Sequence, residues 1–139
     1  NYAKEGYFSR HNTSYWERVP YLGFGVGASS LFENERYDNV GNLKEYIKHA
    51  GISDVRRNIT KLSLKDEMSE FMFLGLRLID GISKQAFTKK FTFTVEEIFG
   101  DVLKKHINNE LLIDNGDFLK LSDRGLDISN YVLSDFLLD

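Results

Sequence analysis

Residues 111–121 have the sequence Leu-Leu-Ile-Asp-Asn-Gly-Asp-Phe-Leu-Lys-Leu, and they decide the fold of the second half of the chain. An Asn-Gly pair between two runs of alternating apolar residues is the strongest short-range signal for a β-hairpin. We therefore predict a hairpin at this position. The segments on both sides of it have the spacing of helices.

Three helices are predicted before the hairpin and one after it. From Ser63, which is followed by two acidic residues, apolar residues recur at helical spacing until Gly81 should end the first helix. A shorter helix begins at Ser83, and Thr94 with Glu97 forms a capping box that opens the third. The last helix is predicted over 124–137. One face of the first helix carries Leu64, Met68, Phe71, Met72, Leu76 and Ile79. The third helix should point Ile98, Val102, Leu103 and Ile107 inward, and the last carries Leu126, Ile128, Tyr131, Val132 and Phe136.

These elements together predict a mostly helical, winged-helix-like domain over residues 63–139. Domains of this shape often bind DNA through the helix before the wing. Acidic side chains on that helix and at the wing tip should repel phosphate, and the net charge of the chain is −3. We therefore expect no nucleic-acid partner and favour a structural or docking role. The acidic residues are Glu96, Glu97, Asp101, Glu110, Asp114 and Asp117.

The first half of the chain has shorter and weaker patterns. Residues 21–28 are apolar and glycine-rich, which indicates a buried strand that leads into a loop. A turn and a short strand are predicted over 33–40, and Asn42 should cap a helix over 43–50. Residues 52–62 are either a strand around Val55–Ile59 or a linker. Residues 1–20 have no clear periodicity.

The composition excludes several classes of protein. Hydrophobic residues make up 42% of the 139-residue chain and charged residues 28%, which are ordinary values for a globular protein. The chain has no cysteine, so it holds no disulfide, thiolate zinc site or iron–sulfur cluster by itself. No apolar run is long enough to span a membrane. We expect a cytoplasmic protein, and the start at Asn1 without a signal-peptide pattern indicates a piece of a longer protein.

The most unusual local string is His11-Asn12-Thr13-Ser14-Tyr15-Trp16. Flat aromatic faces suit a flat ligand, and a neutral imidazole binds iron. The alternative is that Tyr15 and Trp16 pack into a core while His11 bonds to a backbone carbonyl. On composition alone, this packing interpretation is favoured.

The glycines at 23, 25 and 27 resemble a nucleotide-binding loop, because bare backbone lets amides approach a ligand closely. The G-x-G-x-x-G spacing and a following Walker lysine are both missing, so the segment is not a dinucleotide signature. Close approach to a ligand and tight packing against a helix remain equal alternatives.

The other histidines give weaker signals. His49 and His106 have no acidic residues at the spacing of metal ligands, so we expect surface or capping roles for both. Three histidines also give no spacing signature of a catalytic triad.

Several motifs in order resemble one known family. They are Asn1-Tyr-Ala-Lys-x-Gly-Tyr7, His11-Asn-x-x-Tyr-Trp16, Tyr21-Leu-Gly-Phe-Gly-x-Gly-Ala-x-Ser30 and Leu121-Ser-Asp-Arg-Gly-Leu126. The chain resembles the C-terminal part of oxygen-independent coproporphyrinogen III oxidase-like proteins, which are radical SAM proteins. The resemblance implies an α+β chain: the end of a partial α/β barrel with its exit segment over 1–62, and a winged-helix-like cap over 63–139. The family's Cys-x-x-x-Cys-x-x-Cys motif is absent, so no catalytic residue is expected in this chain. S-adenosylmethionine and a [4Fe-4S] cluster are implied for the full-length protein only.

The resemblance also selects between two activities. One branch of the family is proposed to bind haem and pass it to acceptor proteins, and its His-Asn-x-x-Tyr-Trp string is intact here. This branch implies haem binding by His11, Asn12, Tyr15 and Trp16, with His11 as axial ligand to the iron. One alternative is the oxidative decarboxylation of coproporphyrinogen III by a true oxidase. Another is a cap that serves as a protein-interaction or, less favoured, a DNA-binding module.

One segment departs from the family pattern. The usual Gly-Pro-Gly-Ala-His-Ser is Gly25-Val26-Gly27-Ala28-Ser29-Ser30, so a hydroxyl replaces an imidazole at position 29. In the oxidases the residue at this position contacts S-adenosylmethionine. The resemblance therefore implies that Gly25, Gly27, Ala28 and Ser29 belong to a cofactor-contacting loop.

Overall fold

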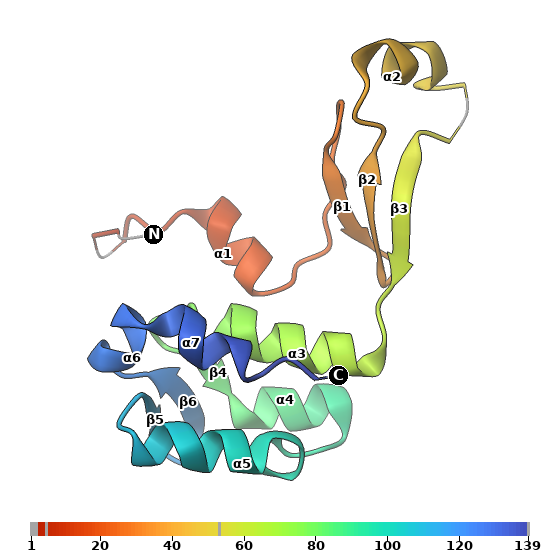
Figure 1. The fold of residues 1–139 in the computed structure, drawn as a ribbon. Coiled ribbons are helices and arrows are strands. Elements are labelled where there is room, and N and C mark those ends of the chain that lie inside the picture. The colour runs from red at the N-terminus through yellow and green to blue at the C-terminus, as the bar shows by residue number, and fades with distance from the viewer. Residues whose placement is uncertain (1–2, 5, 53, 139) are drawn as a thin grey trace. The chain divides into compact units, whose positions relative to one another are not determined.

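The structure is a computed structural model that describes residues 3–4, 6–52 and 54–138 (Figure 1). Contacts divide the chain into two compact units, one made of Asn1–Arg18 with Lys65–Asp139 and the other of Val19–Leu64. The predicted mixed α and β class is confirmed. The predicted domain boundary between 62 and 63 stays a prediction, and the structure groups the first 18 residues with the C-terminal unit. Of the first family motif, Asn1, Tyr2 and Glu5 lie outside the described residues.

The larger unit is built from short helices around a three-stranded antiparallel sheet of order β4-β6-β5 (Figure 1). Three helices, the β5–β6 hairpin and the closing helices give the winged-helix-like arrangement that the sequence predicts. Within the described ranges, every helix is too short or too polar to cross a lipid bilayer. The helices are α1 (Arg10–Trp16), α3 (Leu64–Gly75), α4 (Lys84–Phe91), α5 (Val95–Asn108), α6 (Asp123–Asp127) and α7 (Ser129–Ser134), and the strands are β4 (Ile82–Ser83), β5 (Leu112–Asp114) and β6 (Phe118–Leu121).

Aromatic side chains form the centre of this unit. Phe87 is fully buried and its ring lies 4.7 Å from that of Phe91 and 6.2 Å from that of Phe99, between centroids. The ring of Phe99 in turn lies 5.3 Å from that of Phe136, near the C-terminus. Each fully buried side chain of this size contributes about 1.5–3 kcal/mol relative to an exposed one. The core therefore joins α4, α5 and the last residues of the chain.

Capping predictions near this core are confirmed. The Ser83 hydroxyl accepts a hydrogen bond from the amide of Ala86 and caps α4. Thr94 and Glu97 form the reciprocal capping box at the start of α5. The predicted hairpin is also present as β5 and β6.

Two predicted helices end differently from expectation. The first predicted helix ends at Gly75 and not at Gly81, because the chain turns tightly after Gly75, whose backbone lies against Ile82 of β4. Ile79 therefore lies outside the helix and is 71% exposed. The last predicted helix is divided into α6 and α7 by Ile128, whose φ of −118° and ψ of 33° are not helical.

The smaller unit contains a three-stranded antiparallel sheet of order β1-β2-β3, with one helix between β2 and β3 in the sequence. The turn and strand over 33–40 are confirmed as β2, and 56–61 is a strand and not a linker. Of the buried strand leading into a loop that was predicted over 21–28, the loop is present, with positive φ angles at Gly25 and Gly27. The strand is reduced to a single bridge from Tyr21 to Leu31. The elements are β1 (Ser29–Phe32), β2 (Glu35–Asn39), α2 (Leu43–His49), which Asn42 caps as predicted, and β3 (Arg56–Lys61).

Candidate functional site

The His-Asn-x-x-Tyr-Trp string forms helix α1, which the sequence analysis did not predict. The Ser9 hydroxyl accepts a hydrogen bond from the amide of Asn12 at 3.4 Å and so caps the helix. Because residues four apart lie on one helix face, His11 and Tyr15 are neighbours. Their ring centroids are 4.8 Å apart and the rings meet edge to face at 80°.

The side chains of this string differ in exposure. His11 is exposed, whereas Asn12, Tyr15 and Trp16 are half-buried. Within the described part of the chain, the imidazole of His11 makes a ring contact with Tyr15 and no hydrogen bond. An exposed imidazole without a hydrogen bond keeps a nitrogen lone pair available, which is what a ligand to haem iron requires. The donor set of α1 therefore fits a haem.

The predicted cofactor-loop residues lie together in the smaller unit and are bound to their own sheet. The amide side chain of Asn39 donates to the carbonyls of Gly23 and Gly25 at 3.0 and 2.9 Å. The amide of Gly25 donates to the Tyr46 hydroxyl at 3.1 Å, and that of Gly27 donates to the carbonyl of Val40 at 3.2 Å. The loop is thus shaped by the protein itself, and contact with a cofactor stays a prediction.

Ser29 begins β1 beside this loop. Its hydroxyl donates to Asp38 Oδ1 at 2.6 Å, between neighbouring strands. Ser29 is exposed, as is Gly27, whereas Gly25 and Ala28 are half-buried. The Ser29 hydroxyl, which replaces the imidazole expected at this position, is therefore hydrogen-bonded to the Asp38 carboxylate in this structure.

The expectation for His106 is wrong, because this residue is fully buried. Its Nε2 lies 2.7 Å from Asp135 Oδ2, and Lys105 Nζ donates to the same oxygen at 2.5 Å. The ring of Tyr131 packs edge to face on the imidazole, with 5.6 Å between centroids. His106 thus replaces the predicted Ile107 in the core, and Ile107 is 37% exposed. His49 is half-buried in the last turn of α2.

The hydrogen bond from Lys105 lowers the pKa of Asp135 against the opposing effect of burial, and the bond with His106 lowers it further. The pKa of Lys105 is raised, chiefly by its hydrogen bond to Asp135. The charged forms of Lys105 and Asp135 are therefore stabilised by their ion pair, which joins α5 to the end of α7.

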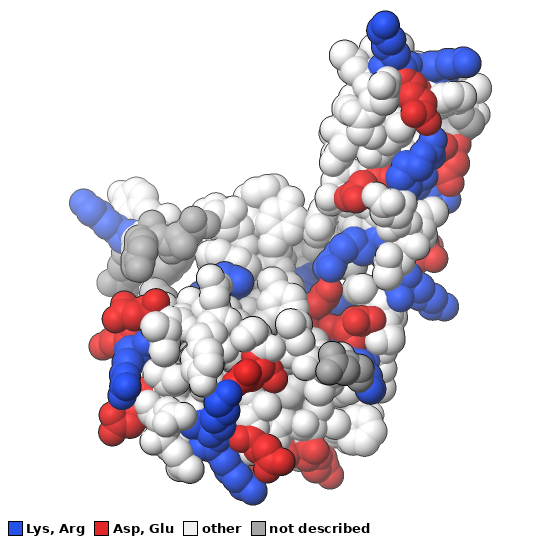
Figure 2. All heavy atoms as spheres, viewed as in Figure 1, with Lys and Arg blue, Asp and Glu red and all other residues white. Residues whose placement is uncertain are grey.

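Two acidic residues that were expected to repel phosphate are paired with one lysine. Lys84 Nζ lies 2.6 Å from Glu96 Oε1 and 2.5 Å from Asp114 Oδ2. Burial disfavours the charged lysine, but the hydrogen bonds to Asp114 and Glu96 outweigh burial and raise its pKa. On the face shown in Figure 2, basic and acidic side chains are interspersed. The absence of a nucleic-acid partner stays a prediction.

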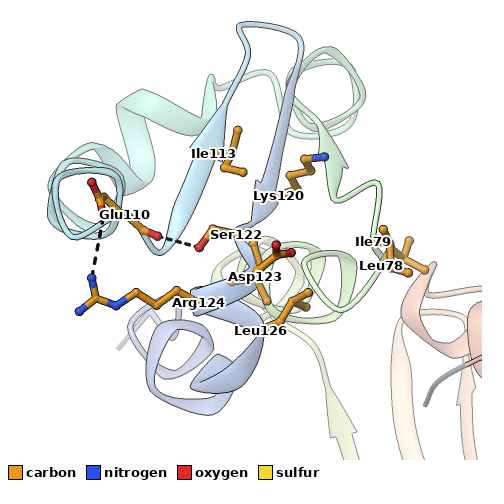
Figure 3. Close-up of a pocket in the computed structure, with 10 residues that line it drawn as sticks. Leu78, Ile79, Glu110, Ile113, Lys120, Ser122, Asp123, Arg124 and Leu126 are labelled. Atoms are coloured by element: carbon orange, nitrogen blue, oxygen red, sulfur yellow. Dashed lines mark hydrogen bonds and ion pairs between the residues drawn. The ribbon is translucent and has the colours of Figure 1, made fainter.

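A pocket of about 330 Å³ lies in the larger unit between the hairpin, the turn after α3 and the start of α6 (Figure 3). At its edge the Ser122 hydroxyl donates to the carbonyl of Glu110 at 2.6 Å. No lining residue is a His, Cys, Met or Tyr, the side chains that bind haem iron. The sequence analysis did not predict this pocket. It is lined by Leu78, Ile79, Glu110, Ile113, Lys120, Leu121, Ser122, Asp123, Arg124 and Leu126.

No group of three His, Cys, Asp or Glu side chains that could hold a metal ion occurs among the residues the structure describes. A haem iron needs only one protein nitrogen, because the porphyrin supplies the other four. The haem interpretation of α1 therefore depends on His11 alone.

Comparison with known proteins shows what the chain is similar to. Residues 62–128 match the family model described as the HemN C-terminal domain. The heme chaperone HemW of Lactococcus lactis subsp. lactis is 36% identical over 139 residues, and that of Bacillus subtilis is 33% identical over 138 residues. These alignments cover 100% and 99% of this chain but 36% of each relative, so the chain spans about a third of their length.

Two further comparisons extend this result. The radical S-adenosyl methionine domain-containing protein 1, mitochondrial, of Danio rerio is 31% identical over an alignment of 150 residues, which covers 99% of this chain and 33% of that protein. The solved coproporphyrinogen III oxidase (HemN) from Escherichia coli, described as a radical SAM enzyme, matches with a TM-score of 0.67 at 16% identity. That match covers 84% of this chain and 28% of the solved one. The predicted resemblance to the oxygen-independent coproporphyrinogen III oxidase-like radical SAM family is confirmed.

Proposed function

We propose that this chain, with its HemN C-terminal domain, is part of a protein that binds haem and delivers it to acceptor proteins. The observation that carries the proposal is the exposed imidazole of His11, which lies beside the Tyr15 ring on α1 and makes no hydrogen bond to any described residue. Its support from comparison is the name heme chaperone HemW that two similar proteins share. The proposed location is the cytoplasm, where a chain without cysteine needs no disulfide.

In this proposal each residue of the string has a role. His11 supplies the axial nitrogen to the haem iron, and the rings of Tyr15 and Trp16 contact the porphyrin. Asn12 offers a polar side chain one turn before Trp16. In the full-length protein a [4Fe-4S] cluster and S-adenosylmethionine would supply radical chemistry, and Gly25, Gly27, Ala28 and Ser29 would contact that cofactor.

The experiment is a titration of haem into the protein, followed by the Soret band. We expect saturable binding in the wild type and in His49→Ala, the matched control on α2. In His11→Ala the binding should weaken strongly, and the spectrum of a histidine ligand should be lost. Equal haem affinity and an equal spectrum in His11→Ala and the wild type would contradict the proposed ligand.

The true oxidase is the alternative enzyme function. The chain contains none of the cysteines that would bind the cluster, so turnover of coproporphyrinogen III has to be measured in a protein that contains the cysteine motif. Decarboxylation with S-adenosylmethionine and a reductant, together with no saturable haem binding, would favour the oxidase over the chaperone.

Docking of the haem acceptor on the cap is a second function, and the pocket of Figure 3 favours it. Ile79 at its edge is 71% exposed and would pack against an apolar side chain of the acceptor. The test is the rate of haem transfer from the loaded protein at increasing concentrations of each haem-free acceptor tried. A rate that rises with acceptor concentration, and that Ile79→Glu makes independent of it, supports docking. A rate that is independent of acceptor in the wild type contradicts docking.

A further inference from the structure

Helix α1 is too small to hold its own position. It has seven residues, and none of them is buried. Isolated helices of this length are not stable in water, and helices in proteins gain most of their stability from packing an apolar face. Something outside the helix must therefore fix the direction in which His11 points.

Arg18, two residues after α1, makes contacts that can do this. Its Nε donates to Glu70 Oε2 at 2.9 Å, and its Nη1 donates to the backbone carbonyl of Glu67 at 3.5 Å. Nη1 also lies 3.5 Å from the Glu67 carboxylate. The Arg18 and Glu70 side chains are only 7% and 6% exposed. A guanidinium can form several hydrogen bonds at once. Because that of Arg18 contacts two residues one turn apart on α3, it fixes the orientation of the Arg18 side chain as well as its distance from the helix.

The partner helix is firmly placed. Met68 and Met72 of α3 are buried in the core of the larger unit, on either side of Glu70 in the sequence. Arg18 itself has a φ of 56°, a left-handed conformation that is uncommon outside glycine and is kept where surrounding contacts determine it. The ion pair therefore connects the segment of α1 to the rigid part of the unit.

We propose that Arg18 is a positioning residue of the haem site, and that its ion pair with Glu70 holds α1 on α3. The inference rests on the proposed function for its haem readout. It implies that the larger unit carries the haem ligand, because residues 1–18 and 65–139 form one compact unit. The sheet unit of residues 19–64 is then not needed to orient His11.

Trp16 gives a readout that does not depend on haem. It is the single tryptophan of the chain, it is half-buried, and it is the last residue of α1. We expect Arg18→Ala and Glu70→Gln to raise the quenching of Trp16 fluorescence by acrylamide and to shift its emission to the red. Arg18→Lys, which keeps the charge but loses the planar fork, should be intermediate. The matched control is Lys90→Ala, because Lys90 also pairs with Glu67, at 3.6 Å, but does not adjoin α1.

The haem titration is then repeated on the same variants. Loss of a buried ion pair should weaken haem binding at least about tenfold in Arg18→Ala and reduce the spectrum of a histidine ligand. Lys90→Ala should bind as the wild type does. Far-ultraviolet circular dichroism checks that each variant is folded, and Arg18→Lys replaces Arg18→Ala if the latter unfolds.

The outcomes separate this inference from the proposed function. Unchanged Trp16 quenching in folded Arg18 and Glu70 variants would overturn the inference, whether or not the haem affinity of these variants changes. Increased quenching with unchanged haem affinity would overturn the positioning role. Unchanged affinity in His11→Ala would overturn the proposed function, and the Trp16 result would still decide whether the ion pair holds α1.

Discussion

His106 is fully enclosed by the core, although it lies next to a lysine and an aspartate. Its Nε2 is paired with Asp135, whereas its Nδ1 has no hydrogen-bond partner among the residues the structure describes. A buried polar atom without a partner costs about 1–3 kcal/mol. The contact of Nε2 with Asp135 therefore offsets part of the cost of burying Nδ1 without a partner.

The Asp135 carboxylate gives a prediction for pH. Its folded pKa is lowered by Lys105 and then by His106, so its stabilising effect is present above the unfolded pKa of about 3.9 and is lost as pH falls through the folded pKa. We expect Asp135→Asn to lower the free energy of unfolding at pH 7, with a difference from the wild type that shrinks towards pH 3. Urea unfolding at several pH values measures it.

The control for this prediction is Asp101→Asn. Asp101 is fully exposed on α5, 3.9 Å from Lys104, so its replacement should change the unfolding free energy by less than about 0.5 kcal/mol at any pH. A difference between Asp135→Asn and the wild type that stays constant down to pH 3 would show that the carboxylate charge is not the cause.

Alanine substitutions at two glycines with positive φ separate two costs to stability, backbone strain and the collision of an added Cβ with its neighbours. Gly116 in the hairpin loop has a φ of 95° and open space where a Cβ would be, so Gly116→Ala should cost about 1–2 kcal/mol. Gly81 has a φ of 73°, and a Cβ there would collide with the carbonyl oxygen of Leu119 and with Lys120. Gly81→Ala should therefore cost about 1–3 kcal/mol more than Gly116→Ala. Thermal unfolding of both variants measures the difference, and equal losses of stability would contradict the proposed collision at Gly81.

At the scale of elements, local signals were predicted and distant partners were not. The caps Ser83 and Thr94 act on amides three residues away, so the sequence alone predicts them. His106 and Ile107 are adjacent, and hydrophobicity favoured Ile107 for the core. The residue that makes His106 acceptable inside is Asp135, 29 positions further along the chain, which no local pattern shows.

Helix α1 illustrates a different failure. None of its residues is buried, so it has no apolar periodicity from which it could be predicted. The capping residue Ser9 was the available local signal. The candidate haem residues were nevertheless proposed, because the family resemblance concerns their chemistry and not their secondary structure.

The capping box of α5 is the clearest test at this scale. Thr94 accepts a hydrogen bond from the amide of Glu97, and its own amide donates to the Glu97 carboxylate at 2.7 Å. Thr94→Ala should lower the free energy of unfolding by about 0.5–2 kcal/mol, whereas Thr94→Ser should retain most of the stability. Ser134→Ala is the control, because the Ser134 hydroxyl donates to the exposed carbonyl of Tyr131 within α7 and caps no helix. Equal unfolding midpoints for Thr94→Ala and Ser134→Ala would contradict the capping role.

At the scale of the whole molecule, the two compact units differ in how much apolar surface they bury. The larger unit contains the connected core of methionine, leucine and phenylalanine side chains. In the smaller unit the buried hydrophobic residues are Leu31, Val40 and Leu62, and every residue of β3 is exposed. Because burial of apolar surface is the main source of stability, the larger unit should be the more stable of the two.

Hydrogen exchange should therefore divide the chain at the unit boundaries. Amides of α3, α5 and β6 are hydrogen-bonded around the core, so we expect them to exchange only through global unfolding of the larger unit. Amides of β1, β2 and β3 should exchange faster, because opening the small sheet exposes few apolar side chains. Mass spectrometry of the exchanged peptides measures this, and Phe99→Ala should speed exchange in α3 and α5 while leaving the sheet of 29–61 as it was. Equal protection of β2 and α5, lost together in Phe99→Ala, would mean that the two units unfold as one.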